Sequence, residues 1–116
     1  MTLIKIKFYK NGYETYGHSD INVCAQISAM HYVINGIFLE LDTDAGCFDG
    51  EDGTGYTALH LENKLFFGLF EVCKENLKKW VENEFDKENY KIIEIDDRLE
   101  WSEVLEEMDK RSLSFG

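Results

Sequence analysis

The chain has 116 residues, a length typical of one domain with a single core. It contains 23 acidic against 12 basic residues, which gives a formal net charge of −11. No nucleic-acid partner is expected, because such binding needs Lys and Arg to neutralise phosphates. A basic protein partner is compatible with this charge, and so is the simpler view that the acidity keeps the protein in solution.

No segment approaches the roughly 20 apolar residues of a membrane-spanning helix, so no membrane partner is expected. The start of the chain, from Met1 to Lys5, has the pattern of a strand rather than of a signal peptide. The three cysteines cannot all pair with one another, and none belongs to a CxxC motif. We therefore expect a cytoplasmic protein with free thiols.

The first part of the chain predicts a β-hairpin. Apolar and polar residues alternate from Leu3 to Lys10, as in a half-buried strand. Asn11-Gly12 follows and predicts a type I′ turn, in which both residues take a positive φ. The segment from Tyr13 to His18 is then the antiparallel return strand, and it brings His18 to the start of the next element.

A helix is predicted next, with cap candidates in Ser19, Asp20 and Asn22. Its apolar side chains recur every three or four residues, at Val23, Ile27, Met30, Ile34, Ile37 and Leu41. His31 lies two turns beyond Cys24, about 10 Å along the axis, which is too far for a direct hydrogen bond. We interpret His31 as a residue of the helix surface or of an interface.

The segment from Asp42 to Gly55 is rich in Asp and Gly. Its spacing does not fit an EF-hand calcium loop, because position 6 would be Cys47 and position 12 would be Gly53. We predict a hairpin instead, with strands near Ala45 to Asp49 and at Tyr56 to Glu62. His60 is interpreted as an ordinary strand side chain.

A second helix has one apolar face, formed by Phe66, Leu69, Phe70, Cys73, Leu77, Trp80 and Val81. Glu71, Lys74 and other charged residues form the opposite face, and Cys73 is expected in the core. Gly68 suggests that something packs closely against this helix, since Gly costs about 1 kcal/mol relative to Ala there.

Tyr90 to Ile95 is the last predicted strand, and Leu99 to Lys110 a short third helix. The apolar side of that helix should dock on the domain or across a dimer interface, with Trp101 as its anchor.

These elements predict an α+β fold with two layers. The mixed sheet has about five strands, the two long helices cover one face, and the order is ββαββαβ with a short C-terminal helix. Residues 1–96 would form the main domain and residues 97–116 a helical extension.

Cys24 and His18 are the candidate chemistry of the chain. Cys24 lies in the first turn of the predicted helix, where unpaired N–H groups and the helix dipole stabilise a thiolate. His18 lies just upstream, and a Cys with a nearby His is the minimum for a thiol nucleophile with its base. The alternative is that Cys24 is an inert small apolar residue at a helix start.

The pair Gly17-His18 and the run from Val23 to Ala29, Val-Cys-Ala-Gln-Ile-Ser-Ala, resemble the ribosomal-processing cysteine protease (Prp) family of bacteria and phages. The likeness covers roughly residues 1–96. It departs from the family pattern in the loop between His18 and Cys24, which here has only five residues.

The resemblance implies a homodimeric cysteine endopeptidase without a cofactor or metal. His18 would be the base and Cys24 the nucleophile, with Ser28 and Asp20 contacting substrate. The expected substrate is a basic protein, ribosomal or phage structural, that loses an N-terminal extension.

Two other interpretations remain open. The chain could keep the protease fold and act as a non-catalytic binding module, with the short loop holding His18 and Cys24 out of register. A zinc site built from His18, Cys24, Cys47 and His60 is conceivable, but no CxxC or HxxxH pair anchors it.

Overall fold

The computed structural model describes residues 3–49 and 55–115. Within these ranges the α-helices are α1 (Ile21–Leu41), α2 (Phe67–Glu84) and α3 (Trp101–Phe115). The strands are β1 (Ile4–Phe8), β2 (Gly12–Tyr16), β3 (Gly46–Asp49), β4 (Tyr56–His60) and β5 (Tyr90–Glu94). Short 3-10 turns precede α2 and β5, at Lys64–Phe66 and Lys87–Asn89. This order confirms the predicted α+β fold class.

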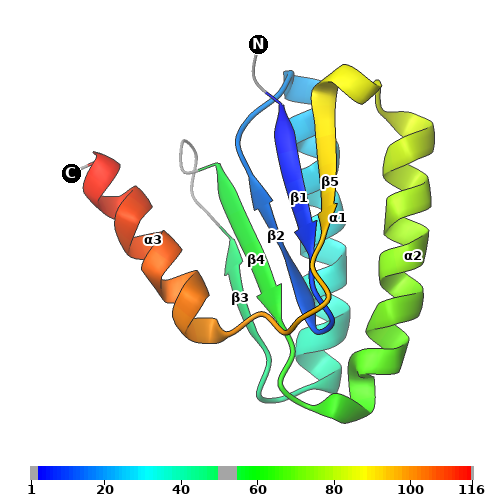
Figure 1. Cartoon of the computed structure of the whole chain (residues 1–116), viewed down its shortest axis with the longest axis vertical. Coiled ribbons are helices and arrows are strands. Elements are labelled where there is room, and N and C mark those ends of the chain that lie inside the picture. The colour runs from blue at the N-terminus through cyan, green and yellow to red at the C-terminus, as the bar shows by residue number, and fades with distance from the viewer. Residues whose placement is uncertain (1–2, 50–54, 116) are drawn as a thin grey trace.

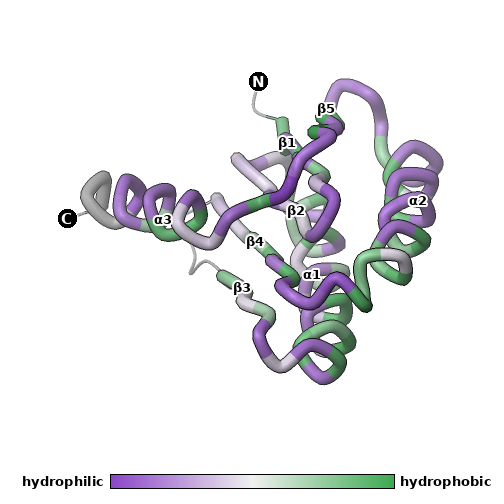
Figure 2. Tube along the Cα trace, turned by 60° about the horizontal axis from the view of Figure 1, so that its bottom comes forward, coloured by the Kyte–Doolittle hydropathy of each residue, from purple (hydrophilic) through white to green (hydrophobic). Residues whose placement is uncertain are grey.

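The strands form one mixed sheet in the order β3-β4-β2-β1-β5. β1 pairs with β5 in parallel, and the other neighbours are antiparallel. α1 and α2 cover one face of the sheet, and α3 lies against the other (Figures 1 and 2). No helix in the described ranges is both long enough and apolar enough to cross a membrane.

The main core lies between the sheet and the pair α1 and α2. β1 supplies Ile4, Ile6 and Phe8, which are buried while Lys5 is exposed. This alternation is the period-2 pattern expected of a strand with one covered face. The helices contribute a further set of buried side chains: Val23, Ile27, Phe38, Phe70, Leu77 and Val81.

A second, smaller core lies under α3. It consists of Tyr9, Tyr56, Ala58, Leu99 and Val104. Trp101 packs against its edge, and a Cβ added to Gly46 would lie 2.9 Å from the indole. The C-terminal helix therefore docks on the domain itself, as its apolar stripe predicts, with Leu99 and Val104 more deeply buried than Trp101.

Glu14 is a buried carboxylate beneath α3, and it is almost surrounded by phenols. Its oxygens accept hydrogen bonds from Tyr9, Tyr16 and Tyr56 at 2.5, 2.8 and 2.5 Å. Burial, together with these hydrogen bonds, raises the pKa of all three phenols. The three donors supply the partners that a buried carboxylate requires.

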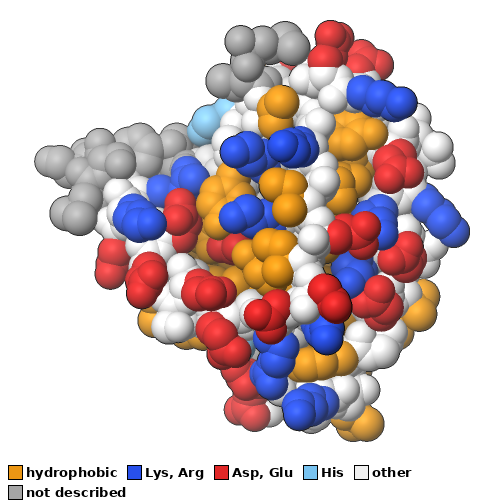
Figure 3. Space-filling view, viewed as in Figure 1, with side chains coloured by type: hydrophobic (Ala, Val, Ile, Leu, Met, Phe, Trp, Pro, Cys, Tyr) orange, Lys and Arg blue, Asp and Glu red, His pale blue; other side chains and the backbone are white. Residues whose placement is uncertain are grey.

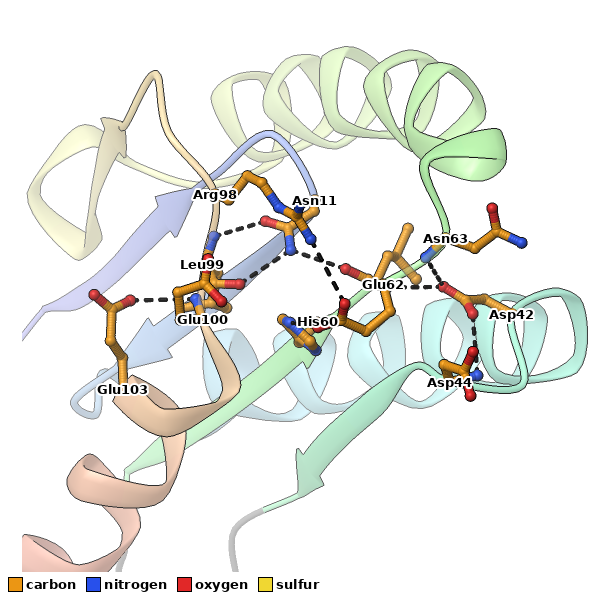
Figure 4. Close-up of polar contacts among 11 residues, drawn as sticks. Asn11, Asp42, Asp44, His60, Glu62, Asn63, Arg98, Leu99, Glu100 and Glu103 are labelled. Atoms are coloured by element: carbon orange, nitrogen blue, oxygen red, sulfur yellow. Dashed lines mark hydrogen bonds and ion pairs between the residues drawn. The ribbon is translucent and has the colours of Figure 1, made fainter.

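The predicted type I′ turn at Asn11-Gly12 is wrong, because neither residue has a positive φ. Gly12 is instead the first residue of β2, and a Cβ there would overlap the carbonyl oxygen of Leu59. The Asn11 side chain is buried and donates to the carbonyls of Leu61 and Leu99, at 2.9 and 3.0 Å (Figure 4). Gly12 therefore allows close packing against Leu59, and the Asn11 side chain forms a clamp, meaning that it holds Leu61 and Leu99 together by hydrogen bonds.

The interpretation of His31 as a surface residue is also wrong, since it is fully buried. Its Nδ1 lies 2.6 Å from the Tyr13 hydroxyl, and its Nε2 lies 3.1 Å from the carbonyl oxygen of Phe48. The core-facing stripe of α1 runs through His31 and Asn35, while Ile37 and Leu41 are largely exposed. Polar partners on the sheet allow a histidine and an asparagine to occupy positions expected to be apolar.

Three expectations about α2 are corrected as well. Lys74 is buried rather than exposed, and its Nζ lies 2.7 Å from Glu71 and 3.5 Å from the carbonyl oxygen of Tyr9. Gly68 has open space around it, since a Cβ there would meet nothing within 4 Å. Leu69 is half exposed, so the apolar face of α2 is narrower than predicted.

Candidate active site

The candidate site begins where β2 ends, at Gly17. This residue has a φ of +90°, which L side chains rarely adopt, and a Cβ there would lie 2.8 Å from the carbonyl oxygen of Leu3. Its N–H donates to the carbonyl oxygen of Gly55 at 2.7 Å. Gly17 therefore turns the chain toward α1 and ties this turn to the residue that precedes β4.

His18 lies on the surface directly after this turn. A Cβ added to Gly55 would lie 2.8 Å from His18 Nε2 and 3.2 Å from Cδ2. The imidazole therefore packs over Gly55, where the missing side chain gives it room. Two glycines thus determine the position of this histidine.

Asp20 is the N-cap of α1. Its carboxylate accepts the Val23 N–H at 3.0 Å, and its carbonyl oxygen accepts the Cys24 N–H at 3.0 Å. Side-chain capping satisfies one of the N–H groups that have no intrahelical partner at a helix start. The structure confirms Asp20 as a cap, and its contact with substrate stays a prediction.

Cys24 is partly buried in the first turn of α1. The Ser19 N–H lies 3.3 Å from its Sγ, and Sγ lies 3.5 Å from the carbonyl oxygen of Ser19. An N–H donor and the positive end of a helix dipole both stabilise a thiolate over a thiol. The Cys24 sulfur therefore lies at the start of α1 with both a backbone N–H and a backbone carbonyl of Ser19 beside it.

His18 and Cys24 lie on the same strand-to-helix turn, with Ser19 between them. In residues 3–49 and 55–115 no hydrogen bond joins the imidazole to the sulfur, and Ser19 is the residue that contacts Sγ. Catalytic hydrogen bonds are often loose before substrate binds. The structure therefore brings the two residues to one turn without a hydrogen bond between them in the described ranges.

Ser28, the other residue expected to contact substrate, is exposed on α1. It follows Cys24 by four positions and therefore lies one turn further along the same side of the helix. Its expected contact with substrate stays a prediction.

The other cysteines have a different environment from Cys24. Burial, with a contribution from Asp49, raises the pKa of the Cys47 thiol, and burial also raises the pKa of the Cys73 thiol. All three cysteines are free. Cys24 is the one whose sulfur faces a backbone N–H in the described part of the chain.

The four residues of the conceivable zinc site do not come together. His18 packs at Gly55, just before β4, whereas His60 is the last residue of β4. His60 is buried, its Nε2 lies 3.0 Å from Glu62 Oε1, and its ring packs near Trp101. No cluster of three or more metal-ligating side chains occurs among the described residues.

Two elements of the site were not predicted from the sequence. Ser19 contributes its backbone, which carries no residue-specific signal. Gly55 is distant from His18 in sequence, and only the pairing of the strands brings it under the imidazole.

The chain matches no protein-family model, and it matches no curated protein.

Proposed function

We propose that the chain is a cysteine endopeptidase of the ribosomal-processing type, with Cys24 as nucleophile and His18 as general base. The observation that carries this proposal is the position of Cys24 Sγ. Sγ lies in the first turn of α1, 3.3 Å from the Ser19 N–H. The exposed imidazole of His18 lies on the same strand-to-helix turn. The resemblance of Gly17-His18 and Val23–Ala29 to the protease family supports the same assignment.

In the proposed reaction His18 accepts the Cys24 proton, and the thiolate attacks the scissile carbonyl carbon. A C–S bond forms and the carbonyl becomes an oxyanion. The C–N bond then breaks, and the leaving amine takes its proton from His18. Water hydrolyses the thioester to release the acid and restore the thiol.

The oxyanion would be stabilised by backbone N–H groups at the start of α1. Val23 and Cys24 already donate to Asp20. Ile21 and Asn22 are the first two helical residues, and their N–H groups have no intrahelical acceptor. They are therefore the donors that we assign to this role.

The substrate that we propose is an N-terminal extension of a ribosomal or phage structural protein, cleaved in the cytoplasm. The net charge of −11 favours a polypeptide that is basic overall. We also propose a homodimer. Apolar side chains on α1 that are at least half exposed, or nearly so, support it: Ile21, Tyr32, Val33 and Ile37.

The second candidate is a non-catalytic binding module. It is favoured by the packing of His18 over Gly55 and by the absence of a His18–Cys24 hydrogen bond in the described ranges. In that case the exposed face of α1 would be the functional surface.

Thiol alkylation distinguishes the two functions. In the double variant Cys47→Ala/Cys73→Ala, Cys24 should react with iodoacetamide at pH 7 faster than the thiol of free cysteine, because the proposed reaction needs a reactive sulfur. Adding His18→Ala should slow this reaction. A rate no faster than that of free cysteine, and unchanged by His18→Ala, would favour the binding module.

Cleavage gives the second readout. The wild-type chain should trim an N-terminally extended ribosomal protein, and Cys24→Ala should not. Cys47→Ala is the matched control, because it removes a partly buried thiol distant in sequence from the site. Cleavage by Cys24→Ala would refute the assignment.

A further inference from the structure

A hollow lined by basic side chains adjoins the candidate site on the face of the sheet that carries α3. Its volume is about 340 Å³, and it is lined by Leu3, Lys5, Lys7, Tyr16, Gly17 and Arg111. Among the described residues this lining includes three basic side chains and no acidic one. In a chain with 23 acidic and 12 basic residues, this is a local reversal of charge.

The strand register explains why these side chains gather. Lys5 of β1 pairs with Tyr16 of β2 on one side and with Lys91 of β5 on the other. Paired residues project from the same face of a sheet, so the three form a row across the strands. α3 covers β4 and the adjoining strands but leaves this end of β1 and β5 open, where Lys and Arg side chains gather (Figure 3).

Tyr16 forms the floor of the hollow and is held in place by contacts on several sides. Lys7 Nζ lies 5.0 Å from its ring centroid, and Arg111 Cζ lies 5.3 Å from the same centroid. Its hydroxyl donates to the buried Glu14. Arg111 Nε also donates to Glu107 Oε1 at 3.0 Å, so recognition of an acidic group falls to Lys7 together with Lys5.

The hollow and the candidate site meet at the turn after β2, because Gly17 lines the hollow and His18 follows Gly17 in the chain. We propose that it binds an acidic side chain of the peptide substrate, next to the scissile bond. This inference rests on the proposed function for its view of the peptide as a substrate. The overall acidity would attract a basic polypeptide, and the hollow would select the position of an acidic residue within it.

The test uses the inactive Cys24→Ala chain, so that binding is measured without cleavage. The probe is a fluorescein-labelled hexaglutamate peptide, with hexaglutamine as its uncharged counterpart. Hexaglutamate should bind and hexaglutamine should not, with amide NMR shifts at Leu3, Lys5, Gly17 and Lys91. Lys5→Glu/Lys7→Glu should weaken binding by at least about tenfold.

Lys64→Glu/Lys79→Glu is the matched control. It makes the same change of charge at two exposed positions, on the 3-10 turn before α2 and on α2, neither of which lines the hollow, and it should change binding by less than about twofold. Lys5→Gln/Lys7→Gln should give an intermediate loss, and it keeps the test valid if the charge-reversed variant misfolds. Equal losses in Lys64→Glu/Lys79→Glu and in the hollow variants, shifts confined to other surfaces, or tighter binding of hexauridylate would overturn the inference.

The outcome is separable from that of the proposed function. If hexaglutamate binds but Cys24 is unreactive, the inference about the hollow stands and the proposed protease activity fails. If the chain cleaves its substrate equally well with and without Lys5 and Lys7, the proposed protease activity stands and the inference about the hollow fails.

Discussion

Asn11 is hydrogen-bonded to both backbone polar groups of Leu99, a residue 88 positions later in the chain. Its Nδ2 donates to the Leu99 carbonyl at 3.0 Å, and its Oδ1 accepts the Leu99 N–H at 2.7 Å (Figure 4). The same amide donates to Leu61 at the end of β4. One side chain therefore connects the first turn of the sheet to the segment that leads into α3.

Replacement of Asn11 by Ala should lower the free energy of unfolding by about 2–3 kcal/mol, because it leaves buried backbone groups of Leu99 and Leu61 without partners. Urea denaturation followed by circular dichroism measures this loss. Asn76→Ala is the control, since Asn76 is exposed and donates to Val72 within its own helix. Equal losses in the two variants would show that the clamp contributes little.

Gly12 and Gly68 should respond to alanine in opposite directions. Gly12→Ala should destabilise the chain by more than about 3 kcal/mol, because the new methyl group overlaps the backbone of Leu59. Gly68→Ala should stabilise it by about 0.5–1 kcal/mol, because the added Cβ meets open space and Ala favours a helix. Thermal denaturation of both variants checks the signs.

Trp101→Ala should destabilise the chain by about 2 kcal/mol through the loss of apolar contact with Gly46 and the smaller core. Alkylation of Cys24 should be unchanged, because Trp101 packs on the opposite face of the sheet from α1. Ser102→Ala, at the next and exposed position, should have an effect within about 0.5 kcal/mol. A changed Cys24 rate in Trp101→Ala would contradict this separation.

Because His31 is buried, the folded chain should lose stability in mild acid. Burial lowers its pKa, while Asp49 and the Phe48 carbonyl act in the opposite direction. The unfolded chain therefore binds more protons than the folded chain below about pH 6.5, and stability falls as the pH drops from there. His31→Gln should have a flatter stability profile than the wild-type chain between pH 7 and 5, and an unchanged profile would contradict this role of His31.

Asp42 should cause a second loss of folding stability, at lower pH. Burial opposes its ionisation, but N–H groups of Asn63, Glu62 and Asp44 donate to it and lower its pKa overall (Figure 4). Its contribution is present above about pH 4, the usual range of an aspartate, and disappears as the pH falls through the lowered folded-state pKa. Asp42→Asn should reduce the loss below pH 4 without altering the His31 window.

Periodicity was sufficient to predict the order and type of the elements. The alternation in β1 and the three-and-four spacing in α2 arise from local geometry, and the structure has both. Polar residues in the core were not predictable, because His31 is buried only where Tyr13 and Phe48 provide partners from other elements. Gly12 shows the same limit, since its requirement comes from Leu59 across the sheet rather than from its own turn.

The candidate site was predictable only in part. Asp20 as a cap and Cys24 in the first helical turn follow from local sequence, and the structure places both there. The position of the His18 ring depends on Gly55, and the basic hollow depends on the pairing of β1 with β2 and on α3, which brings Arg111 to it. Such contacts between distant segments cannot be predicted from the residues that are neighbours in sequence.

The parallel pairing of β1 with β5 has a consequence for how the chain acquires its structure. The hairpin of β1 and β2 is marginal by itself, as isolated hairpins are. One side of β1 stays open until β5 arrives, and Ile6 meets Ile92 only after most of the chain has been synthesised. Distant parallel contacts of this kind form slowly. The nascent chain therefore exposes an unpaired strand edge, and substitutions at Ile92 should slow refolding more than equally buried substitutions within α2.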